Sequence, residues 1–180
     1  MSIIAFTGMP FSGKSEAVKI AKEKEIPIIR MGDMVWEEVR KRRLELSDKN
    51  VGFVANEMRE KHGKHIWAEK TVEQIKSMDD KGFLVIDGVR NIEEIDFFKK
   101  KLGEEFIVIA IRVSDKTRYK RAMSRDRQDD SKDIEKVKER DQRELGWGLG
   151  QVIESADIMV SNERDIDNFK KHVNKLLDGL

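Results

Sequence analysis

Short apolar runs alternate along the chain with longer charged stretches whose apolar residues recur every three or four positions. The apolar runs cover residues 3–7, 27–31, 83–87, 106–113 and 158–160. Runs of this length without helical spacing are typical of strands, and consecutive apolar residues indicate burial on both faces, as in a parallel sheet. The pattern therefore predicts five buried strands separated by helices.

The charged, periodic stretches predict the helices between these strands. They are expected at 14–24, from about 34 to 81 with breaks near 46–50 and 62–64, at 91–102, at 116–125, from about 131 to Leu145 and at 166–177. Strands that alternate with helices predict an α/β fold, a three-layer sandwich around a five-stranded parallel sheet. Because ligands bind at the carboxyl ends of such strands, we expect functional residues just after Thr7, Met31, Asp87 and Val113.

A phosphate-binding loop pattern, G-x-x-x-x-G-K-[ST], stands between the first predicted strand and the first predicted helix. It reads Gly8-Met9-Pro10-Phe11-Ser12-Gly13-Lys14-Ser15. Its glycines let backbone N–H groups surround phosphate oxygens, and the helix N-terminus adds the positive end of its dipole. Lys14 is expected to contact the β- and γ-phosphates, and the Ser15 hydroxyl to ligate Mg²⁺. The alternative is a loop that merely turns the chain. The motif predicts that the whole loop binds a nucleoside triphosphate, with ATP and Mg²⁺ as the expected cofactors.

Further motifs, in their order and spacing, give the chain a resemblance to nucleotide kinases of the adenylate kinase and dephospho-CoA kinase type. It is more closely similar to an archaeal P-loop family related to both. The matching stretches are residues 8–15, 31–35, 87–90, 125–132, 140–141 and 156–162. The resemblance implies one domain, 1–180, with an acceptor-binding helical region at about 33–80 and a short lid at about 125–132. It also implies an ATP- and Mg²⁺-dependent phosphotransferase that acts on a nucleotide or nucleotide-like small molecule.

The resemblance assigns roles on the acceptor side of the site. In dephospho-CoA kinases an Asp at the position of Asp33 faces the acceptor hydroxyl, so Asp33 is expected to take up that hydroxyl's proton; alternatively it only caps the helix that begins near Met34. Adenylate kinases carry a phosphate-binding Arg where this chain has Trp36, and Arg40 is the candidate to replace it. Trp36 itself either stacks on a base or packs in the core.

The resemblance also assigns a metal-binding carboxylate and a set of catalytic arginines. Asp87 ends the third strand and is expected to hold a Mg²⁺-bound water, although Asp-Gly is also ordinary turn chemistry. Arg118, Arg121 and Arg125 share one helix face. Arg121 and Arg125 are expected to neutralise charge on the transferring phosphoryl group, and Arg127 to bind the nucleotide. Three further arginines are candidates for substrate binding: Arg90, Arg140 and Arg143. The alternative for the helical arginines is a solvated face with local carboxylate partners.

Composition bears on nucleic-acid binding, on cysteine chemistry and on membrane association. Lys and Arg number 36 against 35 Asp and Glu, so the net charge of +1 gives no reason to expect nucleic-acid binding. The chain has no Cys, which excludes thiolate metal sites and cysteine nucleophiles. Neither a membrane span nor a signal peptide is visible, so we expect a cytoplasmic protein with no membrane partner. The pattern makes no prediction of oligomeric state. The alternative function is a P-loop NTPase or nucleotide-sensing module that acts through a protein or RNA partner.

Overall fold

The computed structural model describes residues 2–78, 82–103, 106–124 and 133–179. The described strands are β1 (Ser2–Thr7), β2 (Ile28–Arg30), β3 (Phe83–Asp87), β4 (Phe106–Arg112) and β5 (Ile158–Ser161). The described helices are α1 (Lys14–Glu23), α2 (Met31–Lys41), α3 (Asp48–His62), α4 (Ile66–Lys76), α5 (Ile92–Leu102), α6 (Asp115–Ser124), α7 (Ile134–Gly146), α8 (Leu149–Glu154) and α9 (Ile166–Asp178). None of these helices has the length and apolar content to cross a bilayer.

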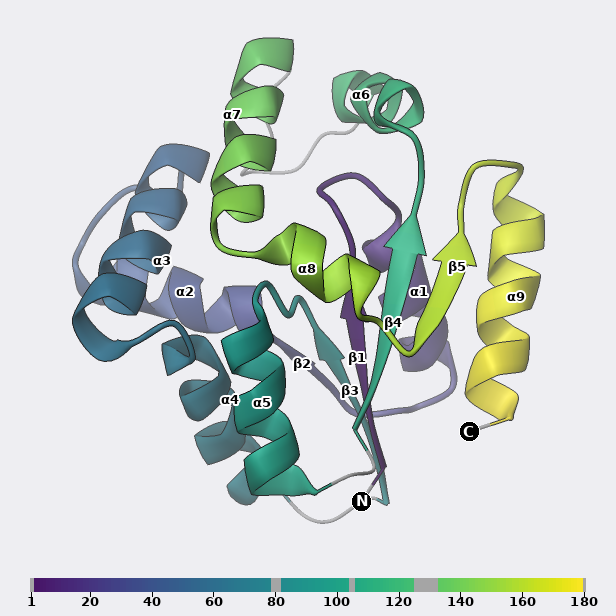
Figure 1. The fold of residues 1–180 in the computed structure, drawn as a ribbon, viewed down its shortest axis with the longest axis horizontal. Coiled ribbons are helices and arrows are strands. Elements are labelled where there is room, and N and C mark those ends of the chain that lie inside the picture. The colour runs from purple at the N-terminus through teal and green to yellow at the C-terminus, as the bar shows by residue number, and fades with distance from the viewer. Residues whose placement is uncertain (1, 79–81, 104–105, 125–132, 180) are drawn as a thin grey trace.

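The strands form one five-stranded sheet in the order β2-β3-β1-β4-β5, and every pair runs parallel. β1 is central, so the loop that follows it leaves the middle of the sheet (Figure 1). Phe6 of β1 pairs with Asp87 of β3, which places the end of β3 beside the start of that loop. The predicted α/β fold with a five-stranded parallel sheet is confirmed.

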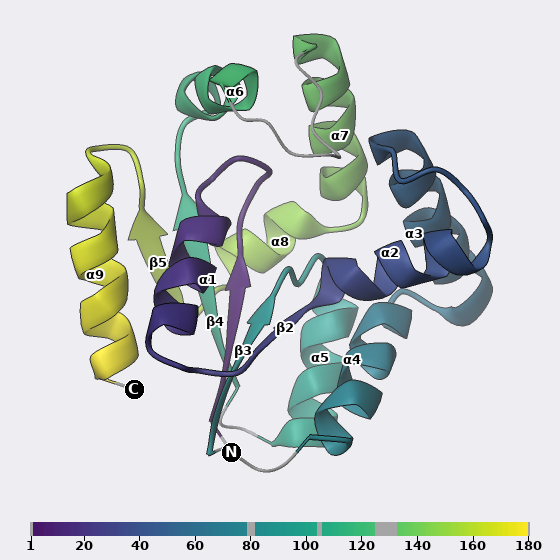
Figure 2. The same cartoon turned by 180° about the vertical axis from the view of Figure 1, so that it is seen from behind.

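Helices cover both faces of the sheet, because alternate strand residues point to opposite sides. On one face Ile4, Phe6 and Ile109 pack in a cluster with residues of α1 and α9, which stand in front of the sheet in Figure 2. On the other face Ile3 and Ala5 belong to a second cluster, which is built with α4, α5 and α8. The buried runs read from the sequence are therefore the middle layer of a three-layer sandwich.

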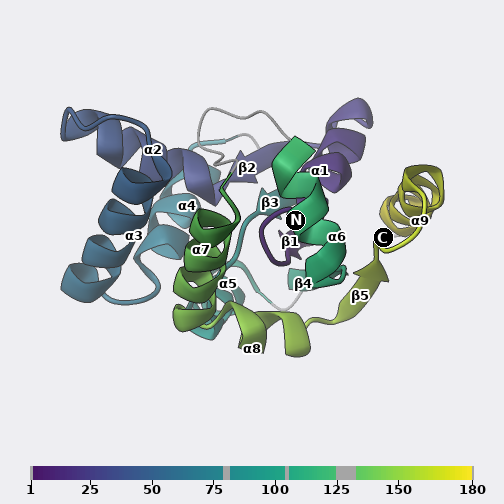
Figure 3. The same cartoon turned by 90° about the horizontal axis from the view of Figure 1, so that it is seen from above.

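The remaining helices lie around the carboxyl ends of the strands. α2 and α3 lie beyond the β2 edge, and α6 and α7 stand over the strand ends (Figures 1 and 3). The predicted helical region at 33–80 corresponds to α2, α3 and α4, which begin two residues earlier than expected, at Met31. The lid predicted at 125–132 lies outside the described residues.

The start of α2 corrects one prediction. The sequence pattern gives Met31 to β2 and makes Asp33 a cap, but β2 ends at Arg30, which is the N-cap residue of α2. Asp33 lies inside the first helical turn, where a carboxylate interacts favourably with the helix dipole. The expected strand was one residue too long because Met31 is apolar and buried, and an apolar residue at this position suits the end of a strand as well as the start of a helix.

The helix predicted to end at Leu145 ends one residue later, and the short helix after it was not predicted. α7 ends at Gly146, and Gly148, with φ of +110°, leads into α8. A positive φ is readily adopted by glycine alone. The six residues of α8 are too few to give a periodic signal, yet its Leu149 and Val152 are completely buried.

A buried guanidinium fixes α6 and α7 to the loop after β1. Arg118 of α6 is 1% exposed and donates to the Pro10 carbonyl at 3.0 Å. It also makes a two-pronged contact with Asp141 of α7, at 3.0 and 2.7 Å. Such paired contacts restrict orientation as well as distance. Arg118 therefore has a structural role, and α7 is held above the loop through it.

Candidate active site

The loop from Gly8 to Ser15 has the backbone that a phosphate cradle requires. Gly8 and Gly13 have φ of +143° and +106°, which strongly favour glycine. A Cβ on Gly13 would lie 2.1 Å from the Asn162 amide nitrogen, and a Cβ on Gly8 would lie 2.5 Å from the Ile111 carbonyl oxygen. Both glycines are therefore fixed by conformation and by space, and Gly13 is the N-cap residue of α1, where no side chain caps the helix.

Phe11 occupies the loop in an unusual conformation. Its φ is +63°, a region in which side-chain-bearing residues are uncommon. Its ring is buried in a small cluster with Ala122 of α6 and Val137 of α7. The apolar contacts offset the cost of this conformation, and the ring ties the loop to the helices above it.

Lys14 begins α1 and turns its ammonium group back over the loop. Its Nζ donates to the carbonyl oxygens of Gly8, at 2.5 Å, and Met9, at 3.2 Å. Burial, and after it the charge of Arg90, lower the pKa of Lys14 from 10.5 to about 7, against the opposing effects of Glu144 and Asp87. An anion bound beside the lysine would favour its charged form, so the site gains from an incoming phosphate.

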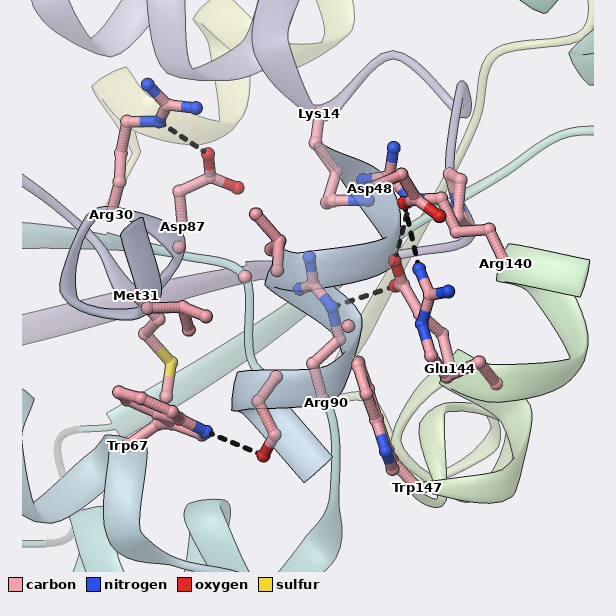
Figure 4. A pocket seen from close by; sticks show the side chains of 18 of the residues that line it. Lys14, Arg30, Met31, Asp48, Trp67, Asp87, Arg90, Arg140, Glu144 and Trp147 are labelled. Carbon is pink, nitrogen blue, oxygen red and sulfur yellow. Dashed lines mark hydrogen bonds and ion pairs between the residues drawn. The ribbon is translucent and has the colours of Figure 1, made fainter. Parts of the chain in front are cut away.

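Lys14 lines a pocket that extends from the loop toward α2, α3 and α7 (Figure 4). The cavity has a volume of about 150 Å³. Its upper part is charged, with Lys14, Asp87 and Arg90 around it. Its lower part is bounded by Met31 and Trp67 on one side and Trp147 on the other. One cavity therefore joins the phosphate loop to a mixed cationic and apolar compartment.

Glu144 of α7 is the buried centre of the charged part. It pairs with the Nε atoms of Arg90, at 2.9 Å, and Arg140, at 3.1 Å. Burial alone would raise the pKa of Glu144, but Arg90, Arg140 and Lys14 outweigh it and lower the pKa to about 2. Glu144 is therefore ionised at neutral pH and orients two arginines beside the loop.

A second carboxylate, on α3, links the acceptor side to α7. Asp48 accepts from Nη2 of Arg143 at 2.8 Å and lies 3.7 Å from Nε of Arg140. Gly52, one turn along α3, makes room for Arg143, because a Cβ there would lie 2.7 Å from the guanidinium. The arginines of α7 are therefore held between the loop and α3.

Asp87 stands at the opposite wall of the pocket, at the end of β3. Its carboxylate is 3.6 Å from Nε of Arg30, and Arg30 in turn is 3.5 Å from Asp33. Within the described ranges, no group of three or more His, Cys, Asp or Glu gathers to hold a metal alone. The Ser15 hydroxyl and the Asp87 carboxylate are oxygen ligands of the kind Mg²⁺ takes together with substrate phosphates.

The structure brings some of the predicted residues together and leaves others apart. Arg90, Arg140, Arg143 and Trp36 all line the pocket with the loop. The described pocket wall does not include Asp33, whose side chain is 56% exposed, nor Arg40, which is exposed. Trp36 is half-buried, with Arg30 and Arg40 each 5.9 Å from its ring.

Arg121 lies outside the pocket, on the other side of the loop. It donates to the backbone carbonyls of Ser12, at 3.4 Å, and Asn162, at 2.9 Å. Arg125 and Arg127 lie outside the described residues. The catalytic role of Arg121 therefore remains a prediction, with the arginine now placed beside the loop backbone.

Sequence reasoning missed several residues of the pocket. They are Asp48, Arg59, Trp67, Glu144 and Trp147. Glu144 carried a detectable signal, since it follows Arg140 by one helical turn. The others come from α3, α4 and the end of α7, and no spacing in the sequence indicates that these segments meet.

The pKa of Lys14 predicts a pH-dependent stability. Between pH 7 and 10.5 the unfolded chain holds the Lys14 proton and the folded chain releases it, so folding stability gains with rising pH through this window. In Lys14→Met this gain should be absent, and the variant should be more stable than the wild type at pH 7 or below. Urea unfolding of both proteins from pH 6 to 10 measures the difference. Parallel pH profiles of the two proteins would contradict the assignment.

Comparison with known proteins places the chain in a family. A family model described as an AAA domain matches residues 7–138. The UPF0200 protein of Methanosarcina barkeri is 44% identical over 179 residues, which cover 99% of this chain and 96% of that protein. The UPF0200 protein of Methanocaldococcus jannaschii is 39% identical over 181 residues, which cover 100% and 91%.

Solved structures share the fold at low sequence identity. Shikimate kinase from Bacteroides thetaiotaomicron has a TM-score of 0.59 at 13% identity, with 98% of each chain covered. TT1252 from Thermus thermophilus has a TM-score of 0.63 at 15% identity, covering 99% of this chain and 97% of that one. These likenesses show a P-loop kinase-like fold. The chain belongs to the UPF0200 family and carries an AAA domain, in agreement with the archaeal P-loop family that its sequence resembles.

Proposed function

We propose that this protein is an ATP- and Mg²⁺-dependent phosphotransferase with a small-molecule acceptor. One observation carries the proposal: the phosphate-binding loop and a separate cationic compartment open into the same cavity, with Lys14 between them. A donor phosphate on the loop and an acceptor in that compartment would both lie within reach of this lysine. Phosphoryl transfer is catalysed mainly by such positioning and charge stabilisation.

The loop would hold the donor. Backbone N–H groups from Gly8 to Ser15 would surround the β- and γ-phosphates, with Lys14 leaving the Gly8 and Met9 carbonyls to meet them. Ser15 and Asp87 would hold the magnesium ion. When bound, that ion neutralises charge on the triphosphate. Arg121, together with Arg125 and Arg127 as predicted from the sequence, would add positive charge on the lid side.

The arginines around Glu144 would hold the acceptor. Because Glu144 and Asp48 fix Arg90, Arg140 and Arg143 before any ligand enters, little reorganisation is needed when charge develops. The sequence predicts a nucleotide or nucleotide-like acceptor, and the anionic group of such an acceptor would bind these arginines. Asp33, on the rim beside Arg30, would take the proton of an acceptor hydroxyl.

Replacement of Lys14 by Met should abolish transfer and leave the fold intact. The variant keeps the volume of the side chain but removes the charge nearest the transferring phosphate, so we expect a loss of at least about 10²-fold in turnover. Labelled ATP with a panel of acceptors measures the transfer. Lys19→Met is the matched control, since Lys19 is on the same helix with a 61% exposed side chain. Equal turnover in wild type and Lys14→Met would overturn the catalytic assignment.

Replacement of Asp33 by Asn separates two kinds of acceptor. If the acceptor is a hydroxyl, loss of the proton-accepting carboxylate should slow transfer by about 10²-fold. ATP affinity should stay the same, because Asp33 is outside the pocket wall. An unchanged transfer rate would remove Asp33 from the chemistry. ATP hydrolysis that no acceptor in the panel stimulates would favour the alternative, an NTPase that acts through another macromolecule.

A further inference from the structure

We propose that the acceptor is a small anion, a phosphate or a carboxylate, on an apolar body about the size of one aromatic ring. The pocket would recognise this body by packing and not by hydrogen bonds. The inference rests on the proposed function, since it takes the acceptor compartment of the same cavity and names the chemistry that fits it.

The apolar part of the pocket is built from aromatic surface. All three tryptophans of the chain, Trp36, Trp67 and Trp147, line the pocket, and Trp67 and Trp147 bound its apolar part. Trp67 is 1% exposed and donates its indole N–H to the Ala55 carbonyl at 3.3 Å. Trp147 donates its indole N–H to the Asn56 side chain at 3.2 Å. With those N–H groups engaged elsewhere, Trp67 and Trp147 offer the pocket apolar surface.

Neutral hydrogen-bonding groups are scarce in the described wall, and its carboxylates, Asp48, Asp87 and Glu144, are each paired with an arginine. Among the lining residues of the described ranges there is no Asn, Gln, Thr, Tyr or His, and the serines, Ser12 and Ser15, belong to the phosphate loop. A site that discriminates bases or sugars uses such neutral donors and acceptors, because an unpaired polar group on either side is costly. A site that packs against a ring or a short alkyl group needs no such neutral donors and acceptors.

The size of the cavity agrees with this chemistry. Its volume of about 150 Å³ equals that of an apolar cavity known to hold benzene, about 150 Å³. Sites for larger organic ligands enclose roughly 300–1,000 Å³. Because that volume includes the part beside the phosphate loop, a compact body of one ring or a few carbons suits the acceptor compartment.

Arginine donors without partners provide the anion site. Arg59 of α3 is 8% exposed; its guanidinium lies 4.2 Å from the Trp147 ring centroid, and its Nη2 donates to Glu94 at 3.0 Å. Its Nε and Nη1, with Nη1 of Arg90 and Nε of Arg143, have no hydrogen-bond partner among the described residues. Guanidinium groups recognise carboxylates and phosphates through such N–H pairs.

The tryptophans provide a binding assay that needs no turnover. Because all of them line this pocket, intrinsic fluorescence should respond to a ligand there. Phenyl phosphate should bind at least about tenfold more tightly than ribose 5-phosphate, which has the same anion on a polar body. Benzyl alcohol, with the ring and no anion, should not bind measurably at the same concentrations. Benzoate in a parallel titration identifies the preferred anion, and binding of either aromatic anion supports the proposal.

Two variants locate the bound anion. Arg143→Gln, at a half-buried position, should weaken phenyl phosphate binding at least about tenfold, a larger loss than Lys14→Met should cause. The reverse pattern would place the anion in the phosphate loop and overturn the proposal. Preference for ribose 5-phosphate, or discrimination among AMP, GMP, CMP and UMP with each bound more tightly than phenyl phosphate, would also overturn it. Absence of ATP-dependent transfer would contradict the proposed function and leave these titrations unaffected.

Discussion

The burial of Lys14 among other charged side chains is the constraint on which the site depends. Burial does most to lower the pKa of Lys14, and the charges of Arg90 and Arg140 add to its effect, while Glu144 and Asp87 oppose it. Buried charges are tolerated only when they are paired, since removal from water costs several kcal/mol per ion. Glu144 compensates part of the charge and is itself held ionised by it. An anion beside Lys14 favours the charged form of the lysine, so the site is suited to the phosphates of a nucleotide.

This charge arrangement is possible because the helices above the sheet are held firmly. Arg118 joins α6 to Asp141 of α7 and to the Pro10 carbonyl, so the helix that carries Arg140 and Glu144 is fixed relative to the loop. The ring of Phe11 adds an apolar contact between the same parts. Arg118 is therefore a buried structural residue that positions Arg140 and Glu144 beside the phosphate loop.

Sequence reasoning predicted the sheet, the loop and the three-layer order, because apolar runs and a motif of fixed spacing report local structure. It also selected Arg90, Arg140 and Arg143. It gave Arg118 no role of its own, although this arginine is buried, because helical spacing puts Arg118 and Arg121 on one face and does not report burial. The aromatic wall of Trp67 and Trp147 was missed because α4 and the end of α7 are far apart in the chain, and only tertiary packing brings them together.

The protonation of Lys14 tests this account most directly. An NMR titration of its side chain, with Lys14→Met to assign the signal, should give a pKa of about 7 in the free protein. With a non-hydrolysable ATP analogue and Mg²⁺ bound, the pKa should rise by about 2 units, because the phosphates favour the charged form. A pKa near 10.5 in the free protein, or no change on addition of the analogue, would contradict the claim that this site is built to bind phosphate.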